Sequence, residues 1–291
     1  MVGVAGSNPV VPNFFISVQK AAMDKILLFI PCYNCENQIK KVLSQFDKDV
    51  IDYISEILVV DNKSDDLTQQ TVIDFAKENP SLPLKLIENN ENYNLGGSHK
   101  VAFNYAIENG FDYVIVLHGD DQASISDLIP LIKDRSYTSY DCLLGARFMP
   151  GSTLIGYSKF RTFGNIIFNS IFSLILFKKI FDLGSGLNIY NVKILKDKFY
   201  INFPDSLTFN CSMLFASHFY KHSIKFFPVS WREDGQVSNV RLVSQAVFTL
   251  KMLISYFVKR KQYIQSDLRS KPVVEYSYKI LFESTVSKNI E

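Results

Sequence analysis

The sequence predicts an α/β fold with a mainly parallel sheet, helices on both faces of the sheet and an apolar helical segment towards the C-terminus. In the first half of the chain, short apolar runs alternate with longer amphipathic segments, which is typical of strand-helix-strand units. In the second half, two long apolar segments have the spacing of helices. The length of 291 residues allows one large domain with a substantial core.

The individual elements follow from this alternation. The expected strands are Ile26–Ile30, Glu56–Val60, Leu84–Ile87, Tyr113–Leu117 and Cys142–Leu144. The segments between them with helical spacing are Glu36–Phe46, Thr68–Glu78 and Ser98–Asn109, the last with Ser98 as N-cap and Gly110 as its C-terminal stop. Right-handed crossovers place the carboxyl ends of such strands at one edge of the sheet.

The two apolar helical segments of the second half are Arg161–Phe181 and Val240–Lys261. Neither has 18 uninterrupted apolar residues, so we expect no transmembrane span. Both contain or end in basic clusters, Lys178-Lys179 in the first and Lys259-Arg260-Lys261 in the second. This pattern suits the interface of an anionic membrane, and the alternative is packing against the protein's own core.

We divide the chain into three parts. Residues 1–22 lack the basic leading region and continuous apolar run of a signal peptide, and we expect them to be a disordered N-terminal extension. The first strand pattern begins at Met23, which we take as the biological start. Residues 23–235 form the main domain, and residues 236–291 form a C-terminal helical segment in contact with membrane or core.

Composition excludes several classes of protein. A formal net charge of +2 is too small for the strongly basic stripe of a nucleic-acid-binding protein. Four scattered cysteines do not make a disulfide framework, which favours a reducing cytosol. Cys32 and Cys35 form a C-x-x-C without the second pair of a zinc site, and we interpret them as residues that flank a strand end. No G-x-G-x-x-G follows the first strand, which argues against a dinucleotide oxidoreductase.

The most informative stretch for function is His118-Gly119-Asp120-Asp121-Gln122, a turn directly after the apolar run Tyr113–Leu117. It lies at the carboxyl end of a buried strand, where open α/β sheets bind ligands. Asp120 and Asp121 offer the oxygen ligands that Mg²⁺ or Mn²⁺ takes beside substrate phosphates. The alternative is an acidic surface turn.

Other polar groups follow neighbouring strands. Pro31–Asn34 ends the first strand, and Asp61, at the end of the second, can accept hydrogen bonds from a nucleobase or a ribose. Asn94–Gly97 opens a helix whose N-terminal amides favour anions. We therefore expect Pro31–Asn34, Asp61–Ser64 and His118–Gln122 to converge at one edge of the sheet.

From about Lys25 to about Tyr256 the sequence resembles family 2 of the inverting glycosyltransferases, and within it the polyprenol-phosphate sugar transferases typified by dolichol-phosphate mannose synthase. The resemblance rests on the order and spacing of seven motifs, which are Pro31–Asn34, Val59–Ser64, Asn94–Gly97, His118–Gln122, Gly145–Phe148, Gly184–Leu187 and Trp231–Asn239.

This resemblance implies a GT-A fold that binds a UDP- or GDP-linked sugar and a divalent metal, Mg²⁺ or Mn²⁺. The residues that it assigns to the donor nucleotide are Pro31, Tyr33, Asn34, Asp61, Asn94, Gly96, Gly97, His118 and Gln122. Asp120, with Asp121, is the implied metal ligand, and Asp120, Arg147 and Arg232 form the catalytic group. A metal and guanidinium groups stabilise the charge that builds on the departing nucleotide diphosphate.

The sequence departs from the family at two positions. His118 replaces the first acid of the D-x-D motif, and neutral imidazole suits Mg²⁺ less well than a carboxylate does. Asp120 must then supply the metal contact. Cys35 stands where relatives often carry Glu, although Glu36 is adjacent.

The acceptor determines whether a catalytic base is needed. A sugar hydroxyl must lose a proton, whereas a lipid phosphate is already ionised. Segment Leu207–Leu214 lies where many hydroxyl transferases carry an acid and contains none, which favours polyprenyl phosphate. A hydroxyl acceptor stays open, with Asp182, Glu233 or Asp234 as its base. The residues that we assign to the acceptor are Lys159, Arg161, Ser185, Gly186 and Ser238.

We therefore expect a metal-dependent inverting enzyme that moves one sugar from a nucleotide-sugar to polyprenyl phosphate, peripheral to the cytoplasmic face of the cell membrane. The second hypothesis is transfer to a hydroxyl of a lipid-linked or surface-polysaccharide saccharide. A third is a catalytically silent nucleotide-sugar-binding protein, because His118 interrupts the metal motif.

Overall fold

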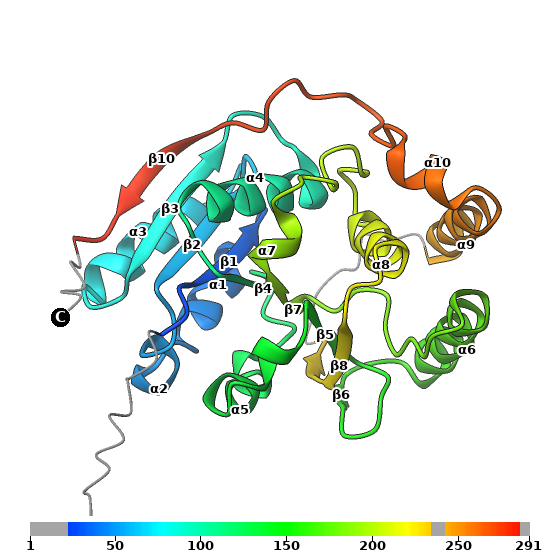
Figure 1. Cartoon of the computed structure of the whole chain (residues 1–291). Coiled ribbons are helices and arrows are strands. Elements are labelled where there is room, and N and C mark those ends of the chain that lie inside the picture. The colour runs from blue at the N-terminus through cyan, green and yellow to red at the C-terminus, as the bar shows by residue number, and fades with distance from the viewer. Residues whose placement is uncertain (1–22, 234–241, 286–291) are drawn as a thin grey trace, which may run out of the picture.

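An eight-stranded sheet forms the centre of the molecule (Figure 1). The computed structural model describes residues 23–233 and 242–285. The order of strands is β10-β3-β2-β1-β4-β7-β5-β8. Their bounds are Ile26–Cys32 (β1), Glu56–Asp61 (β2), Leu84–Asn89 (β3), Tyr113–Leu117 (β4), Cys142–Ala146 (β5), Leu187–Asn191 (β7), Ile224–Pro228 (β8) and Tyr278–Glu283 (β10). Among the strands of this sheet only β7 and β10 pair antiparallel with their neighbours, so the predicted mainly parallel sheet is confirmed.

Helices cover both faces of the sheet, as the sequence predicts. The first half contributes α1 (Glu36–Leu43), α2 (Lys48–Ile51), α3 (Thr68–Glu78), α4 (Asn94–Glu108) and α5 (Ile129–Lys133). The second half contributes α6 (Lys159–Leu176), α7 (Val192–Leu195), α8 (Phe209–Phe219), α9 (Leu242–Val258) and α10 (Arg260–Gln265). Short 3-10 turns lie at Ile125–Asp127 and Ser136–Ser139, and a two-stranded sheet pairs β6 (Thr153–Ile155) with β9 (Ser230–Arg232).

The core lies in two layers that the sheet separates. Along β1, Leu27 and Phe29 pack into the layer that contains side chains of α4, α8 and α9. Leu28 and Ile30, which alternate with them, pack into the layer that contains side chains of α1 and α3. Because both faces of the strand are covered, every position of β1 is buried, which explains its continuous apolar run.

Helix α4 begins at Asn94 and not at the predicted N-cap Ser98. The Ser98 hydroxyl lies inside the helix and accepts a hydrogen bond from Nδ2 of Asn89 (3.0 Å), so it does not act as the N-cap. The amide of Gly96, in the first turn, donates to the Asp205 carbonyl (2.7 Å), so a tertiary contact stabilises this end of the helix. The predicted stop at Gly110 is confirmed, because this residue follows the helix with a φ of +66°.

Several elements were not predicted. Strand β7 inserts antiparallel between β4 and β5, and β8 extends the sheet beyond β5. The C-terminal part, expected to be helical, also contains β10, which pairs antiparallel with β3 at the opposite edge of the sheet. The expected C-terminal segment is therefore not purely helical, because its last part returns to the sheet of the main domain.

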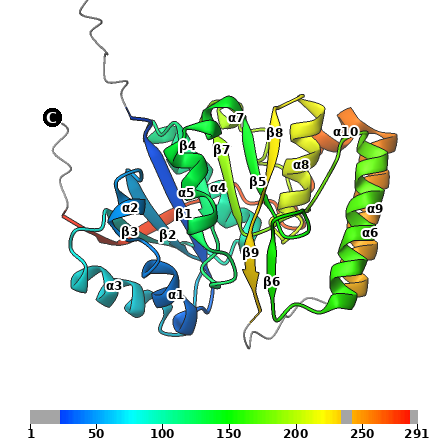
Figure 2. The same ribbon diagram turned by 90° about the horizontal axis from the view of Figure 1, so that it is seen from below.

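The two long apolar helices lie side by side at the end of the molecule that is far from α3 (Figures 1 and 2). Within the described residues, helix α6 ends at Leu176 and α9 at Val258, so both are shorter than predicted. None of the helices in the described part of the chain has the length and apolar character that a membrane span requires. The expectations for residues 1–22 and for the start at Met23 concern a segment outside the described residues.

Candidate active site

The predicted convergence of three chain segments at the carboxyl ends of the parallel strands is confirmed. Cys32 of β1 stands in register with Asp61 of β2. The amide of Gly119, after β4, donates to the Pro31 carbonyl of β1 (3.1 Å). The acidic turn, the end of β1 and the end of β2 therefore occupy one edge of the sheet.

Gly119 permits this close approach because it has no side chain. A Cβ atom at this position would lie 2.7 Å from Cys32 Sγ and 3.0 Å from the Pro31 carbonyl. Both cysteines of the C-x-x-C are buried, and burial raises the pKa of the Cys32 thiol, which keeps it protonated. Cys32 and Cys35 are thus buried side chains that pack at the strand end, as predicted. They are not an exposed pair of reactive thiols.

A cavity of about 660 Å³ opens beside this edge. The sheet side of its wall includes His118, Asp120 and Gln122. Other parts of the wall come from α6, with Phe168, and from α9, with Thr249. The cavity therefore connects the acidic turn with the pair of apolar helices.

Asp120 is the acidic residue of the turn that lines this cavity. Its Oδ1 accepts a hydrogen bond from the Gln122 amide (3.2 Å). Burial, the largest effect, raises the pKa of its carboxyl to about 6. The described residues contain no group of three or more His, Cys, Asp or Glu side chains placed to hold a metal. A divalent cation at Asp120 would therefore need further oxygen ligands from a bound phosphate group, which is how Mg²⁺ is often held.

Asp121 does not line the cavity. Its Oδ1 accepts a hydrogen bond from Nε2 of Gln45 (3.2 Å), and its Oδ2 lies 3.9 Å from Nη1 of Arg232. The backbone amide of Arg232 in turn donates to the Gln122 carbonyl (2.9 Å). Asp121 therefore contacts Gln45 and Arg232 and positions Arg232 beside the turn.

His118 also lines the cavity, and its Nε2 is buried without a hydrogen-bond partner among the described residues. Burial, followed by the nearby charge of Arg147, lowers the pKa of the imidazole to about 4. The ring is therefore neutral at physiological pH. A Cβ atom at Gly186 would lie 2.7 Å from this ring, so the predicted acceptor residue Gly186 makes room for His118.

The two arginines in the cavity wall are already paired with carboxylates. Arg147 makes a bidentate ion pair with Asp182, with Nε to Oδ2 at 2.7 Å and Nη2 to Oδ1 at 2.8 Å. Its guanidinium also lies 4.8 Å from the centre of the Trp231 ring. Arg161 pairs with Glu233 at 2.7 Å. The charge of each arginine is therefore balanced locally, as are the charges of Asp182 and Glu233. Asp234, the third acid considered as a base, lies outside the described residues.

Two of the residues predicted to bind the donor nucleotide are Tyr33 and Asp61. Tyr33 is half exposed, whereas Asp61 is fully buried. Asp61 Oδ2 accepts hydrogen bonds from the Ser64 backbone amide (3.1 Å) and from Gln69 Nε2 (2.7 Å), while Oδ1 is buried and has no partner in residues 23–233 and 242–285. Neither Asp61 nor Tyr33 lines the cavity described above. Asn34 stabilises the loop after β2, because its Oδ1 accepts from the amide of Asp65 (2.9 Å).

Several predicted residues do not line the cavity. Those from the helix start are Asn94, which is exposed, and Gly96 and Gly97, which are buried. Gly96 is packed so tightly that a Cβ atom would lie 2.5 Å from the Pro204 carbonyl, and its amide already has a partner. Ser185 is buried, with its hydroxyl donating to the Leu187 carbonyl (3.2 Å).

Of the other acceptor predictions, Arg161 and Gly186 line the cavity. Lys159 is exposed at the start of α6 and does not line the wall, although Arg161 does. Ser238 lies outside the described residues. Neither Pro31, which is buried in β1, nor Arg232 belongs to the cavity wall.

Two cavity residues that were not among the predicted site residues, Asn210 and Trp231, have buried polar atoms without a partner in the described part of the chain. Asn210, in the first turn of α8, has a buried Oδ1 without a partner among the described residues. The Trp231 Nε1 is likewise buried without a partner there, and Trp231 belongs to a motif that the sequence singled out. The sequence singled out segment Leu207–Leu214 but not Asn210 within it, because tertiary packing of α8 determines which side chain of the segment reaches the cavity.

Solved structures with a similar fold include glycosyltransferases. One is glucosyl-3-phosphoglycerate synthase from Mycobacterium tuberculosis in complex with UDP, with a TM-score of 0.58 and 12% identity over 81% of this chain and 80% of the other. Another is the mannosyltransferase PcManGT from Pyrobaculum calidifontis in complex with GDP-Man and Mn²⁺, with a TM-score of 0.56 and 15% identity over 83% of this chain and 65% of the other. The fold is therefore GT-A, as predicted.

The model of glycosyl transferase family 2 matches residues 28–199, more than half of the chain, and the protein belongs to this family. The resemblance inferred from the motifs is thus confirmed. An undecaprenyl-phosphate mannosyltransferase from Micrococcus luteus is 26% identical over 137 residues, which are 47% of this chain. The match spans about half (54%) of that relative's length.

We expect Asp120→Asn to raise the melting temperature of the metal-free protein near neutral pH. Because burial raises the pKa of this carboxyl from 3.8 to about 6, its contribution to stability is complete below 3.8 and is lost as the pH rises through about 6. Asparagine carries no charge, so the gain should vanish at acidic pH. Thermal unfolding with a chelator at both pH values measures this effect.

The control for this measurement is Asp74→Asn, because Asp74 is exposed on α3. A melting temperature of Asp120→Asn that equals or falls below wild type near neutral pH would contradict the assignment of a desolvated carboxylate.

Proposed function

We propose that this protein transfers one sugar from a nucleotide-sugar to polyprenyl phosphate at the cytoplasmic face of the cell membrane, with a divalent metal as cofactor. The observation that carries this proposal is the cavity, because one wall connects Asp120 at the sheet edge with the apolar helices α6 and α9. A nucleotide diphosphate fits the first region, and an isoprenoid chain fits the second. The relative from Micrococcus luteus acts, by its name, on such a lipid phosphate.

In this proposal Tyr33 and Asp61 bind the nucleoside, and the unpartnered Oδ1 of Asp61 accepts a hydrogen bond from the base or ribose. Asp120 holds the cation, Mg²⁺ or Mn²⁺, and Gln122 and Arg232 contact the diphosphate. The bound cation would neutralise the charge that develops on the leaving diphosphate. The similar structures include complexes with UDP and with GDP-Man and Mn²⁺, so both UDP- and GDP-linked donors are candidates.

The charges in the cavity favour a phosphate acceptor over a hydroxyl. A hydroxyl needs a carboxylate that is free to take its proton. Asp182 is paired with Arg147 and Glu233 with Arg161, so neither of these two acids is positioned as an independent base. An ionised phosphate needs no base, and its oxygen attacks the anomeric carbon directly with inversion. Transfer to a saccharide hydroxyl is the second candidate, with Glu233 as the base once it is released from Arg161.

We also propose that α6 and α9 bring the protein to the membrane surface. Both helices expose large apolar side chains, which are Phe160, Phe163, Ile166, Ile167, Ile171 and Leu174 on α6 and Val247, Phe248, Ile254, Phe257 and Val258 on α9. Lys178-Lys179 and Lys259-Arg260-Lys261 follow the ends of the two helices. An apolar face next to basic residues suits an anionic bilayer.

The transfer reaction can be tested directly. We expect radiolabelled sugar to move from a UDP- or GDP-sugar to polyprenyl phosphate in the presence of Mn²⁺, and Asp120→Ala to lower the rate by about 100-fold or more. Asp74→Ala serves as the matched control. Transfer that needs a saccharide hydroxyl, with none to bare polyprenyl phosphate, would refute the proposed acceptor.

Membrane contact has a separate test, flotation with anionic vesicles. Leu174 is 75% exposed on α6, and Leu67 is 66% exposed near α3 at the far end of the molecule. Because burying a leucine side chain stabilises by about 1.5–3 kcal/mol, Leu174→Ser should weaken vesicle binding about tenfold or more. Leu67→Ser should leave it unchanged. Equal effects of the two substitutions, or no flotation of the wild type at low salt, would contradict this membrane surface.

A further inference from the structure

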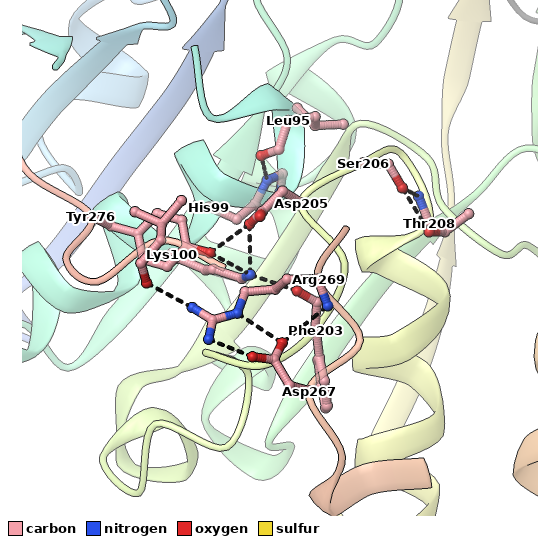
Figure 3. A network of polar contacts seen from close by, with 11 residues as sticks. Leu95, His99, Lys100, Phe203, Asp205, Ser206, Thr208, Asp267, Arg269 and Tyr276 are labelled. Atoms are coloured by element: carbon pink, nitrogen blue, oxygen red, sulfur yellow. Dashed lines mark hydrogen bonds and ion pairs between the residues drawn. The ribbon is translucent and has the colours of Figure 1, made fainter. Parts of the chain in front are cut away.

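Lys100, in α4, is a fully buried cation to which the proposed reaction gives no role. Its Nζ donates hydrogen bonds to the Phe203 carbonyl (2.6 Å), to Asp205 Oδ1 (2.6 Å) and to the Tyr276 hydroxyl (3.0 Å) (Figure 3). The Tyr276 hydroxyl donates to the same Asp205 oxygen (2.8 Å). We call Lys100, Asp205 and Tyr276 the latch.

The latch joins three segments that are far apart in the sequence. Lys100 comes from α4, Asp205 from the loop before α8, and Tyr276 from the segment between α10 and β10. In this last segment the Tyr276 hydroxyl also bonds to Arg269, which forms an ion pair with Asp267 (2.6 Å) (Figure 3). The C-terminal segment 267–276 is thus attached to the body of the protein through buried charge.

Stability alone is a weak reason for such a pair. Burial lowers the pKa of Lys100 to about 8, although Asp205 acts in the opposite direction, so the ammonium is held at an energetic disadvantage. Apolar residues of the same volume often stabilise a fold as well as a buried ion pair does. A buried pair does, however, fix one geometry, because its donors and acceptors have specific directions.

The latch lies next to one wall of the cavity. The Asp205 carbonyl accepts from the amide of Gly96, and the Gly96 position is closed to any side chain by Pro204. Residues directly next to these contacts line the cavity: Leu95 on the α4 side and Leu207 with Asn210 on the α8 side.

The wall is packed against α6 and α9, the helices that we assign to the acceptor. On α8, the Phe215 ring stacks on Tyr256 of α9 at 4.7 Å between centroids and on Phe172 of α6 at 5.9 Å. Helix α8 therefore carries Asn210 on the same packed unit as α6 and α9. Of the proposed nucleoside residues, Tyr33 directly follows β1 and Asp61 ends β2, so neither belongs to these helices.

We propose that Lys100 is a positioning residue for the acceptor. Through Asp205 and Tyr276 it holds the wall formed by Leu95, Leu207 and Asn210 and makes this wall depend on the C-terminal segment 267–276. The inference rests on the proposed function, since it assigns this wall to the acceptor. In the described part of the chain, neither Tyr33 nor Asp61 has a hydrogen bond or ion pair with a residue of the latch.

The test uses Tyr276→Phe and Lys100→Met in the full chain. Tyr276→Phe removes the hydroxyl but keeps the ring, which packs against Tyr93 at 5.3 Å. Tyr278→Phe is the matched control, because Tyr278 packs against Tyr105 outside the latch. A second control is Lys85→Met, since Lys85 bonds to the Tyr105 hydroxyl (2.7 Å) and pairs with Glu283 of β10 away from the cavity wall.

We expect both latch variants to raise the KM for polyprenyl phosphate about fivefold or more. Their KM for the nucleotide-sugar should stay within about twofold of wild type, and both controls should match wild type in both constants. An unchanged acceptor KM, or equal rises in the two KM values, would overturn the proposal. If Lys100→Met fails to fold, Tyr276→Phe still decides.

A measurement without turnover separates this inference from the proposed function. Amide hydrogen exchange in residues 205–211 should be about tenfold faster in Tyr276→Phe than in Tyr278→Phe. Equal exchange in the two variants overturns the latch, whatever the acceptor is. Absence of any transfer to polyprenyl phosphate by the wild type, together with faster exchange in Tyr276→Phe, refutes the acceptor assignment and leaves the latch as a contact that fixes this wall.

Discussion

The contact between the Gly119 amide and the Pro31 carbonyl, at 3.1 Å, is the constraint on which the site depends. It brings the turn after β4 against the end of β1, and it excludes any side chain at position 119. The turn is thereby directed so that Asp120 lines the cavity while Asp121 is held by Gln45. The neighbouring strand β2 then places Asp61 at the same edge. The candidate site thus lies where the loops after neighbouring parallel strands leave the sheet at the same edge.

Charge balance is the second feature of the cavity. Its two arginines are paired with Asp182 and Glu233, and His118 is neutral because burial disfavours its charged form. Asp120 is different, since burial raises its pKa without an ion pair strong enough to reverse the shift. A buried carboxylate of this kind is stabilised by a cation, and a cation at Asp120 would in turn attract a diphosphate. The proposed chemistry follows from the burial of the Asp120 carboxylate in the wall of the cavity.

The sequence predicted what depends on local pattern. Apolar runs predicted the parallel strands, and turn residues after them predicted the meeting of Asp61 with the acidic turn. It did not predict β7 or β10, because their neighbours in the sheet are far away in the chain. The same reason applies to single residues: Gly96 matches a phosphate-binding pattern, but its amide bonds to Asp205, more than a hundred positions away. Asn210 is absent from the prediction because only packing of α8 brings it to the cavity.

The central claim is that Asp120 and a nucleoside diphosphate hold a divalent cation together. Electron paramagnetic resonance of Mn²⁺, titrated with UDP and with GDP, tests this claim most directly. The account predicts that the wild type binds Mn²⁺ tightly only with one of these nucleotides, that Asp120→Asn abolishes this binding, and that Asp121→Asn retains it. Nucleotide-dependent Mn²⁺ binding that is unchanged in Asp120→Asn would contradict the account.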